Sequence, residues 1–168
     1  MKLAEIAAGS ERMKGISSGY IYEKIIEREN QGSTGFGDGV ALPHARLDGI
    51  EEFLIFIVVS KRGVDFEAID KKKTFVFFVI LGPETEVSTH LKLLATISRV
   101  LSNSNAKKEL MNSRTQEAIY EAFVRNTRMV EKKGQAKQKM KLLYVILYFD
   151  EFLYHVLEFF IEKGVEGA

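Results

Sequence analysis

The sequence predicts an α/β fold in which a β-sheet is covered by helices on both faces. Two continuous runs of apolar, β-branched and aromatic residues, at 53–59 and 74–81, have the length of strands. Runs of this kind are typical of strands buried on both faces, and that burial requires helices above and below the sheet. Helical periodicity before and after the two runs predicts those helices.

Two amphipathic helices are predicted within residues 2–30, before the first of these strands. Each carries one apolar stripe at helical spacing. The stripes consist of Leu3, Ile6 and Ala7 in the first helix and of Ile21, Ile25 and Ile26 in the second. Ser17 and Ser18 are candidate N-caps of the second helix, because a serine hydroxyl accepts a hydrogen bond from a free N–H of the first turn.

Further helices are predicted after the second strand. The first of them is expected to open at His90, with Ser88 and Thr89 as candidate caps. Its inward stripe is expected to consist of Leu91, Leu94, Ile97, Val100 and Leu101. Two shorter helical segments follow, at residues 106–111 and 116–126. We expect residues 1–126 to form one domain.

The composition changes after this domain. Six Lys or Arg residues and a single Glu lie between residues 127 and 141, with almost nothing to bury. This pattern predicts a basic, flexible linker at residues 127–140. A basic patch for nucleic acid or anionic lipid is the alternative, but no aromatic side chains are interleaved with the charges, as single-stranded nucleic acid would require.

A strand and a helix are predicted after the linker, in residues 141–168. The strand covers residues 142–149, and the helix begins at Asp150 with apolar residues at helical spacing. One strand and one helix cannot bury their own apolar faces, so this segment is expected to be a fragment of a second domain. We expect it either to dock on the first domain or, preferably, to pair with a second chain and form a homo-oligomer through residues 141–168.

Composition excludes several classes of protein. The 168 residues include no cysteine, so neither a disulfide framework nor a zinc ribbon is expected. The net charge of +1 argues against a general nucleic-acid-binding protein. No apolar run approaches the ~20 residues that span a bilayer, and Glu5 interrupts the segment where a signal peptide would need its apolar core. The expected location is therefore the cytoplasm.

His44 is the most informative residue of the chain. It follows a glycine-rich turn at residues 32–39 and a short apolar stretch that ends at Pro43, an arrangement that presents a side chain at a strand end. The turn lacks the G-K-[ST] of a phosphate-binding Walker loop and precedes a strand-like segment, so it is not a dinucleotide fingerprint either. A neutral imidazole has a ring nitrogen free to attack an electrophile near pH 7.

His90 and Arg28 are the candidate partners of His44. A second imidazole could donate a hydrogen bond to a phosphate oxygen, and a guanidinium could add a bidentate contact. Such a set suits phosphoryl transfer through an imidazole, which depends on positioning and charge stabilisation. Metal binding by the two histidines is the alternative, but the spacing matches no metal motif and no third ligand is evident. No cofactor is expected.

A family resemblance makes this prediction more specific. Residues 28–44 read RENQGSTGFGDGVALPH and strongly resemble the active-site signature of the fructose/mannitol-type EIIA domains of the bacterial sugar phosphotransferase system. This group includes the nitrogen-regulatory EIIA proteins. Residues 63–75 resemble the middle section of these domains, and residues 90–98, HLKLLATIS, resemble their second histidine motif. The resemblance covers roughly residues 1–126.

The resemblance implies a mixed sheet flanked by helices on both faces and a phosphorylated His44. His44 would accept phosphate from the small carrier protein HPr and pass it to an EIIB partner, while His90 and Arg28 stabilise the phosphoryl group. The leading segment with its edge strand, usual in the family, is expected to be absent or reduced, because the first helix begins almost at Met1. Residues 141–168 resemble, more weakly, the first strand and helix of a PII-like signalling domain.

Two functions from different classes follow from this resemblance. One is an EIIA-type phosphocarrier, an enzyme component of sugar uptake. The other is a regulatory binding module in which the phosphorylation state of His44 controls a transporter or kinase, with association to a membrane transporter as one form. A metal-dependent hydrolase using His44 and His90 is a third and weaker alternative.

Overall fold

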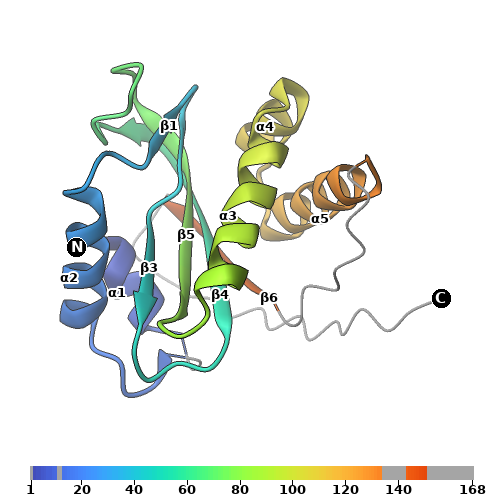
Figure 1. Ribbon diagram of the computed structural model, residues 1–168. Coiled ribbons are helices and arrows are strands. Elements are labelled where there is room, and N and C mark those ends of the chain that lie inside the picture. The colour runs from blue at the N-terminus through green and yellow to red at the C-terminus, as the bar shows by residue number, and fades with distance from the viewer. Residues whose placement is uncertain (1, 11–12, 134–142, 151–168) are drawn as a thin grey trace.

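Figure 1 shows the computed structural model, which describes residues 2–10, 13–133 and 143–150. In these residues one six-stranded sheet is surrounded by five helices. The helices are α1 (Lys2–Ala8), α2 (Ser18–Glu29), α3 (Val87–Leu101), α4 (Ser104–Asn112) and α5 (Gln116–Lys133). The strands are β1 (Gly35–Gly37), β2 (Val40–Ala41), β3 (His44–Leu47), β4 (Phe53–Val64), β5 (Thr74–Pro83) and β6 (Leu143–Asp150).

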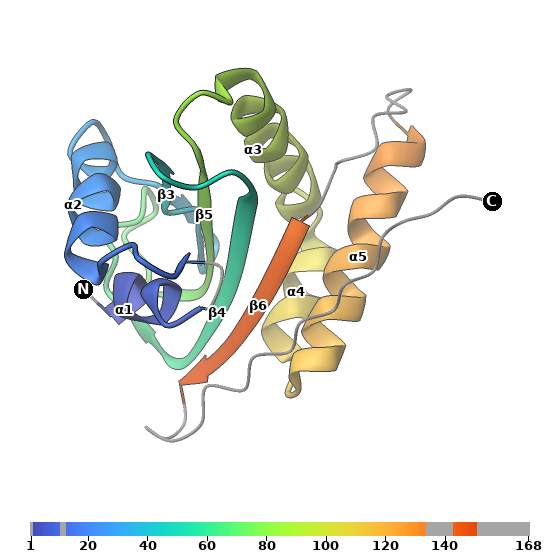
Figure 2. The same cartoon turned by 90° about the horizontal axis from the view of Figure 1, so that it is seen from below.

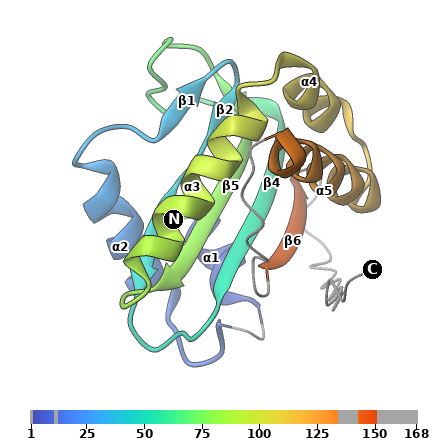
Figure 3. The ribbon, with the colours of Figure 1, turned by 45° about the vertical axis from the view of Figure 1, so that its right-hand side comes forward.

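The sheet is mixed, as expected. β5 lies at its centre, with β2 and β3 following one another along one edge, both parallel to β5. β4 pairs with the other edge of β5 in the antiparallel direction. β1 pairs with β2, and β6 pairs with β4 in the parallel direction. Figure 3 shows α3 crossing this sheet in front of β5, with β6 beyond β4.

Helices cover both faces of the sheet, which confirms the predicted architecture (Figure 2). Alternate residues of β4 belong to two separate cores, because successive side chains of a strand point to opposite faces. Ile55 and Ile57 pack with α3, α4 and α5, whereas Leu54 and Phe56 pack with α1 and α2. Full burial of each such side chain contributes about 1.5–3 kcal/mol, so the two continuous apolar runs specify the centre of the fold.

The two N-terminal helices form where the sequence predicts them. Ser17 is the N-cap of α2, and its Oγ accepts a hydrogen bond of 3.1 Å from the backbone N–H of Tyr20. Ile21 and Ile25 are buried against the sheet, whereas Ile26 is partly exposed. α2 ends at Glu29, which leaves Arg28 in its last turn.

The start of α3 differs from the prediction. The helix begins at Val87 and its N-cap is Glu86, so neither Ser88 nor Thr89 caps it. His90 is consequently the fourth residue of the helix. The inward face of α3 starts at His90 and continues at helical spacing. These inward residues are His90, Leu93, Ile97, Val100 and Leu101. Leu91, which the sequence analysis placed inside, is 61% exposed.

The predicted linker at residues 127–140 is wrong in its first half, because α5 continues as helix to Lys133. Contacts within α5 and with α4 hold the helix at the point where this extension starts. Thr127 is buried and its Oγ1 donates to the carbonyl of Phe123 at 2.8 Å. Asn126 donates from Nδ2 to Glu109 Oε2 at 2.9 Å, and Arg125 forms an ion pair with Glu109. Residues 134–140 lie outside the described residues.

The strand of the tail is β6, and it adds to the sheet of its own chain. Its residues pair in parallel with β4, from Phe53 with Leu143 to Ser60 with Asp150. This strand therefore docks on the first domain of its own chain, which is one of the two arrangements expected for it. The helix predicted after Asp150 and the PII-like resemblance fall on residues outside those described.

No helix in the described part of the chain combines the length and the apolar character needed to cross a bilayer.

Candidate functional site

His44 lies at a break in the edge of the sheet. β2 and β3 both pair with β5, and Leu42 and Pro43 separate them. The carbonyl of Pro43 accepts the ladder hydrogen bond from Ile80 N–H at 2.9 Å. The carbonyl of Leu42 is turned instead to the imidazole of His44, whose Nδ1 lies 2.8 Å from it. The break thus supplies a backbone acceptor that holds the ring.

The two nitrogens of His44 have different partners. A carbonyl oxygen only accepts, so the contact with Leu42 requires the proton to be on Nδ1. Nε2 then carries the lone pair, and it accepts a hydrogen bond of 2.9 Å from Nε of Arg28. The hydrogen bonds therefore define one neutral tautomer, in which Nε2 is the nucleophilic nitrogen.

The pKa of His44 is lowered from its ordinary value, chiefly because burial disfavours the charged ring. The hydrogen bond to Leu42 raises this pKa and the guanidinium of Arg28 lowers it further, in decreasing order of effect. Since His44 is half-buried, its ring is still reachable from outside. A neutral and accessible imidazole is the reactive form of this side chain.

Arg28 is fixed by the turn that follows α2. Its Nη1 donates to the carbonyl of Gly32 at 3.0 Å. The same turn is tied to the helix by Glu29, whose two carboxylate oxygens accept from the N–H and the hydroxyl of Thr34 at 2.7 and 2.5 Å. The end of α2 and the start of β1 thereby form one hydrogen-bonded unit that aims the guanidinium at His44.

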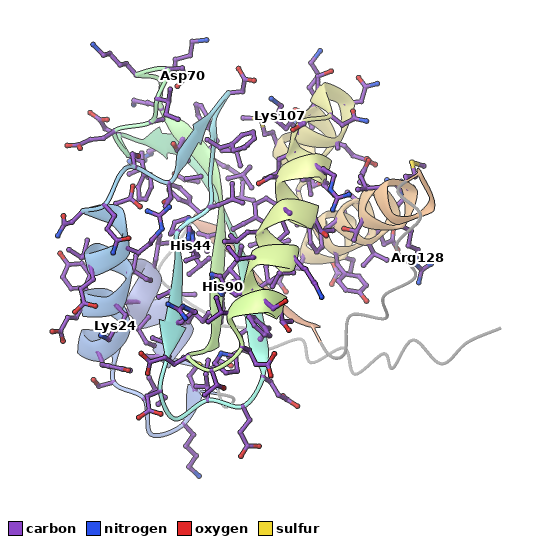
Figure 4. All side chains as sticks on the ribbon, in the orientation of Figure 1. Lys24, His44, Asp70, His90, Lys107 and Arg128 are labelled. Carbon is purple, nitrogen blue, oxygen red and sulfur yellow. The ribbon has the colours of Figure 1, made fainter. Side chains whose placement is uncertain are left out.

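His90 faces His44 from α3. The ring centroids of the two histidines are 5.4 Å apart, and His90 is only 5% exposed (Figure 4). Burial is the largest cause that lowers the pKa of His90, and electrostatic interaction with His44, Arg46 and Arg28 adds to it, which brings this pKa to about 4. His90 is therefore uncharged at neutral pH. Its Nδ1 is buried without a hydrogen-bond partner among the described residues.

Phe53 packs against the other side of His90. Its ring centroid lies 5.9 Å from that of His90. The ring of Phe53 occupies the space over Gly82, where a Cβ atom would lie 2.1 Å from Phe53 Cε1. Gly82 therefore allows the aromatic ring to hold His90 in place.

Arg46 adds a second guanidinium to this region. It follows His44 by two residues on β3, opposite Gly82 of β5, and its Nη1 donates to the carbonyl of Glu84 at 3.2 Å. Arg46 was not among the residues predicted from the sequence, although the alternation of side chains along a strand would have placed it on the same face as His44. Phe53 and the carbonyl of Leu42 were not predicted as parts of the site either, because the sequence carries no signal for these contacts.

The structure brings together all three residues that the sequence analysis selected. Arg28 comes from α2, His44 from β3 and His90 from α3, and Figure 4 shows the two histidines between β3 and α3. In the described residues, no group of three or more His, Cys, Asp or Glu side chains could hold a metal ion. The arrangement is a neutral nucleophilic imidazole flanked by a second imidazole and a guanidinium, which can accept an anionic group.

Comparison with known proteins gives consistent results. The family model described as "Phosphoenolpyruvate-dependent sugar phosphotransferase system, EIIA 2" matches residues 3–126. A "Nitrogen regulatory protein" of Pseudomonas aeruginosa is 38% identical over 104 residues, which are 62% of this chain and 68% of that protein. A "PTS system fructose-specific EIIA component" of Haloferax volcanii is 29% identical over 101 residues, 60% of this chain and 66% of that protein.

A solved structure has a similar fold. The nitrogen regulatory protein IIA-Ntr from Neisseria meningitidis superposes with a TM-score of 0.63 and 30% sequence identity. The superposition covers 67% of this chain and 77% of the Neisseria chain.

Proposed function

The chain belongs to the EIIA 2 family of the phosphoenolpyruvate-dependent sugar phosphotransferase system, and on this premise we propose that it carries a phosphoryl group on Nε2 of His44. HPr is the proposed donor, and an EIIB protein or domain is the proposed acceptor. The observation that carries this proposal is the pair of hydrogen bonds that leaves the Nε2 lone pair of His44 directed at Arg28.

The transfer exchanges one N–P bond for another. Nε2 of His44 donates its lone pair to phosphorus while the N–P bond of the phosphohistidine on HPr breaks. The electron pair of that bond returns to the HPr ring, which carries a proton on its other nitrogen and therefore leaves as a neutral imidazole. The proton on Nδ1 of His44 stays in its hydrogen bond to Leu42. No general base is needed, because the lowered pKa of His44 already keeps the ring neutral.

Arg28 and His90 have separate proposed roles. Arg28 releases the lone pair of Nε2 and donates instead to an oxygen of the incoming phosphoryl group, a charge-assisted contact. His90 is uncharged at neutral pH and offers a ring N–H to a second oxygen. Both contacts act on charge that moves during the transfer, so they stabilise the transition state more than the separated proteins.

The surface beside the site supports a protein as phosphate donor. Val87 and Leu91, on the turns of α3 that carry His90, are 46% and 61% exposed. Exposed apolar side chains beside a reactive group are typical of a docking surface. One pocket among the described residues, of about 660 Å³, lies away from the site, since its lining includes Val59, Phe75, Met111 and Arg114.

The test is incubation of the protein with phosphoenolpyruvate, enzyme I and HPr, followed by intact-mass and fragment analysis. We expect one acid-labile phosphate on His44 and none on a His44→Ala variant. This substitution removes a half-buried side chain at a strand start, so we expect the fold to stay intact. Equal phosphate incorporation in His44→Ala would show the assignment to be wrong.

Regulation is the second candidate function. Proteins named nitrogen regulatory protein are among the similar sequences and structures, and a regulator would use the same phosphorylated His44 to control a transporter or kinase. Onward transfer distinguishes the two functions. Loss of phosphate from His44 on addition of an EIIB protein supports the carrier, whereas retention of phosphate across a set of EIIB proteins supports the regulator.

A further inference from the structure

We propose that Arg46 is a further catalytic residue, a second guanidinium that binds an oxygen of the phosphoryl group on His44. This inference rests on the proposed function, because it assigns one more contact to the same phosphoryl group. The family resemblance implies stabilisation of this group by Arg28 and His90, and it assigns no role to Arg46.

The direction of the Arg46 side chain follows from the strand that carries it. Ala45 and Leu47 are buried in the core formed with α1 and α2. Since side chains alternate along a strand, His44 and Arg46 point to the opposite face, toward α3. Their Cα atoms are separated by two strand steps, about 6.6 Å, which a guanidinium on its three-carbon stem can span.

A backbone contact holds the guanidinium near His90. Nη1 of Arg46 donates to the carbonyl of Glu84, in the loop that leads into α3. Arg46 also lies opposite Gly82 in the β3–β5 register, and Gly82 is covered by the ring of Phe53, which packs on His90. The positive charge of Arg46 is one of those that lower the pKa of His90, in agreement with this closeness.

The phosphoryl group has one more oxygen than Arg28 and His90 together would bind. It carries about two negative charges distributed over three oxygens. Arg28 and His90 account for two donors, and His90 adds no positive charge at neutral pH. A guanidinium has five N–H donors, of which Arg46 uses Nη1 for Glu84. Arg46 would complete three donors for three oxygens and add the second full positive charge.

The test compares Arg46→Gln and Arg46→Lys with Arg62→Gln as the matched control. Arg62 is also exposed, but it lies at the far end of β4, so its replacement makes the same change of charge away from the site. We expect Arg46→Gln to lower the initial rate of phosphorylation by phospho-HPr about tenfold, the usual loss for one charge-assisted contact. Arg46→Lys is expected to fall between Arg46→Gln and the wild type, and Arg62→Gln to equal the wild type.

A second measurement separates phosphoryl binding from docking. In the phosphorylated protein, ³¹P NMR titration gives the pKa of the phosphoryl group, which a neighbouring cation lowers. We expect this pKa to rise in Arg46→Gln and to stay near the wild-type value in Arg46→Lys and Arg62→Gln. A slower rate with an unchanged phosphoryl pKa overturns the proposal, because Arg46 would then act on HPr docking alone, and so does an unchanged rate. If the wild type itself takes up no phosphate on His44, the proposed function fails first.

Discussion

At the scale of single residues, both ring nitrogens of His44 are hydrogen-bonded in the structure. Leu42 fixes the tautomer, and Arg28 covers the one lone pair that can react. Without a phosphoryl group, Nε2 of His44 stays hydrogen-bonded to Arg28. An incoming phosphoryl group offers the guanidinium a better acceptor. Under the proposed function, Arg28 therefore releases Nε2 of His44 when the group to be transferred arrives.

The low pKa of His90 predicts a loss of stability in acid. Unfolded His90 takes up a proton below its ordinary pKa of 6.5, but folded His90 does so only near pH 4. The free energy of unfolding is therefore expected to be at its full value above pH 6.5 and to fall as the pH drops to 4, with His90 responsible for on the order of 2–3 kcal/mol. Urea denaturation at several pH values measures this fall.

His90→Asn provides the comparison. It removes the titrating ring, so its unfolding free energy should fall less over the same pH window, whatever its stability at pH 7. A variant whose acid-induced loss equals that of the wild type would show that His90 titrates normally in the folded protein.

The site could be predicted from the sequence only in part at this scale. His44, His90 and Arg28 were found because they occur in recognisable motifs. The Leu42 carbonyl, which decides the tautomer, is a backbone atom present at every residue, so no residue type marks it. Arg46 was missed because a solvated arginine on an edge strand looks like ordinary surface charge.

At the scale of secondary structure elements, the packing between β4, β5 and α3 determines where His90 lies. Phe53 at the start of β4 reaches over Gly82 near the end of β5 and contacts His90 in the first turns of α3. Three elements therefore meet at one glycine, and the position of the second histidine depends on the absence of a side chain there.

Gly82→Ala is expected to displace Phe53 and, with it, His90. The added Cβ would lie 2.1 Å from the Phe53 ring, and overpacking of this kind costs typically about 1–3 kcal/mol. We expect a lower free energy of unfolding in urea and a slower phosphorylation of His44. Gly19→Ala is the control, because its Cβ would meet only Ser17 Oγ at 3.9 Å on α2, where alanine favours the helix. Wild-type stability and rate in Gly82→Ala would contradict this account.

Element boundaries were less predictable than the elements themselves. The strands at 53–59 and 74–81 were found because their apolar runs are continuous. The extent of α5 was missed because its last turns are rich in charge, a composition shared by solvated helices and linkers. Asn126, just before the missed turns, contacts Glu109 on α4, and a contact between residues distant in the sequence leaves no local signature.

At the scale of the whole molecule, the two outer edges of the sheet have different occupants. The β5 edge carries β2 and β3 with the site at their junction, and the β4 edge is covered by β6. β6 and the site thus lie on opposite sides of the central pair of strands. The sequence predicted the strand at 142–149, but strand partners depend on the register of distant residues, which periodicity does not encode.

Truncation after Lys133 is expected to leave phosphorylation of His44 intact. It is also expected to destabilise the protein and to promote association between chains. Loss of β6 frees the N–H and C=O groups along β4 from Phe53 to Ser60, and a free edge of apolar sequence promotes association between chains. We expect a lower free energy of unfolding and a larger species in light scattering, with normal phosphate uptake on His44. A truncated chain that is as stable and as small as the full chain would show that β6 does not protect this edge.

The pairing of β6 with β4 also bears on the order in which the molecule assembles. Paired residues such as Phe53 and Leu143 are separated by about 90 positions in the chain, and contacts of such long range form slowly because a large loop must close first. During synthesis, which proceeds from the N-terminus, the segment that carries Arg28, His44 and His90 leaves the ribosome well before residue 143. The residues of the proposed phosphoryl site can therefore be in place while the opposite side of the sheet still lacks its last strand.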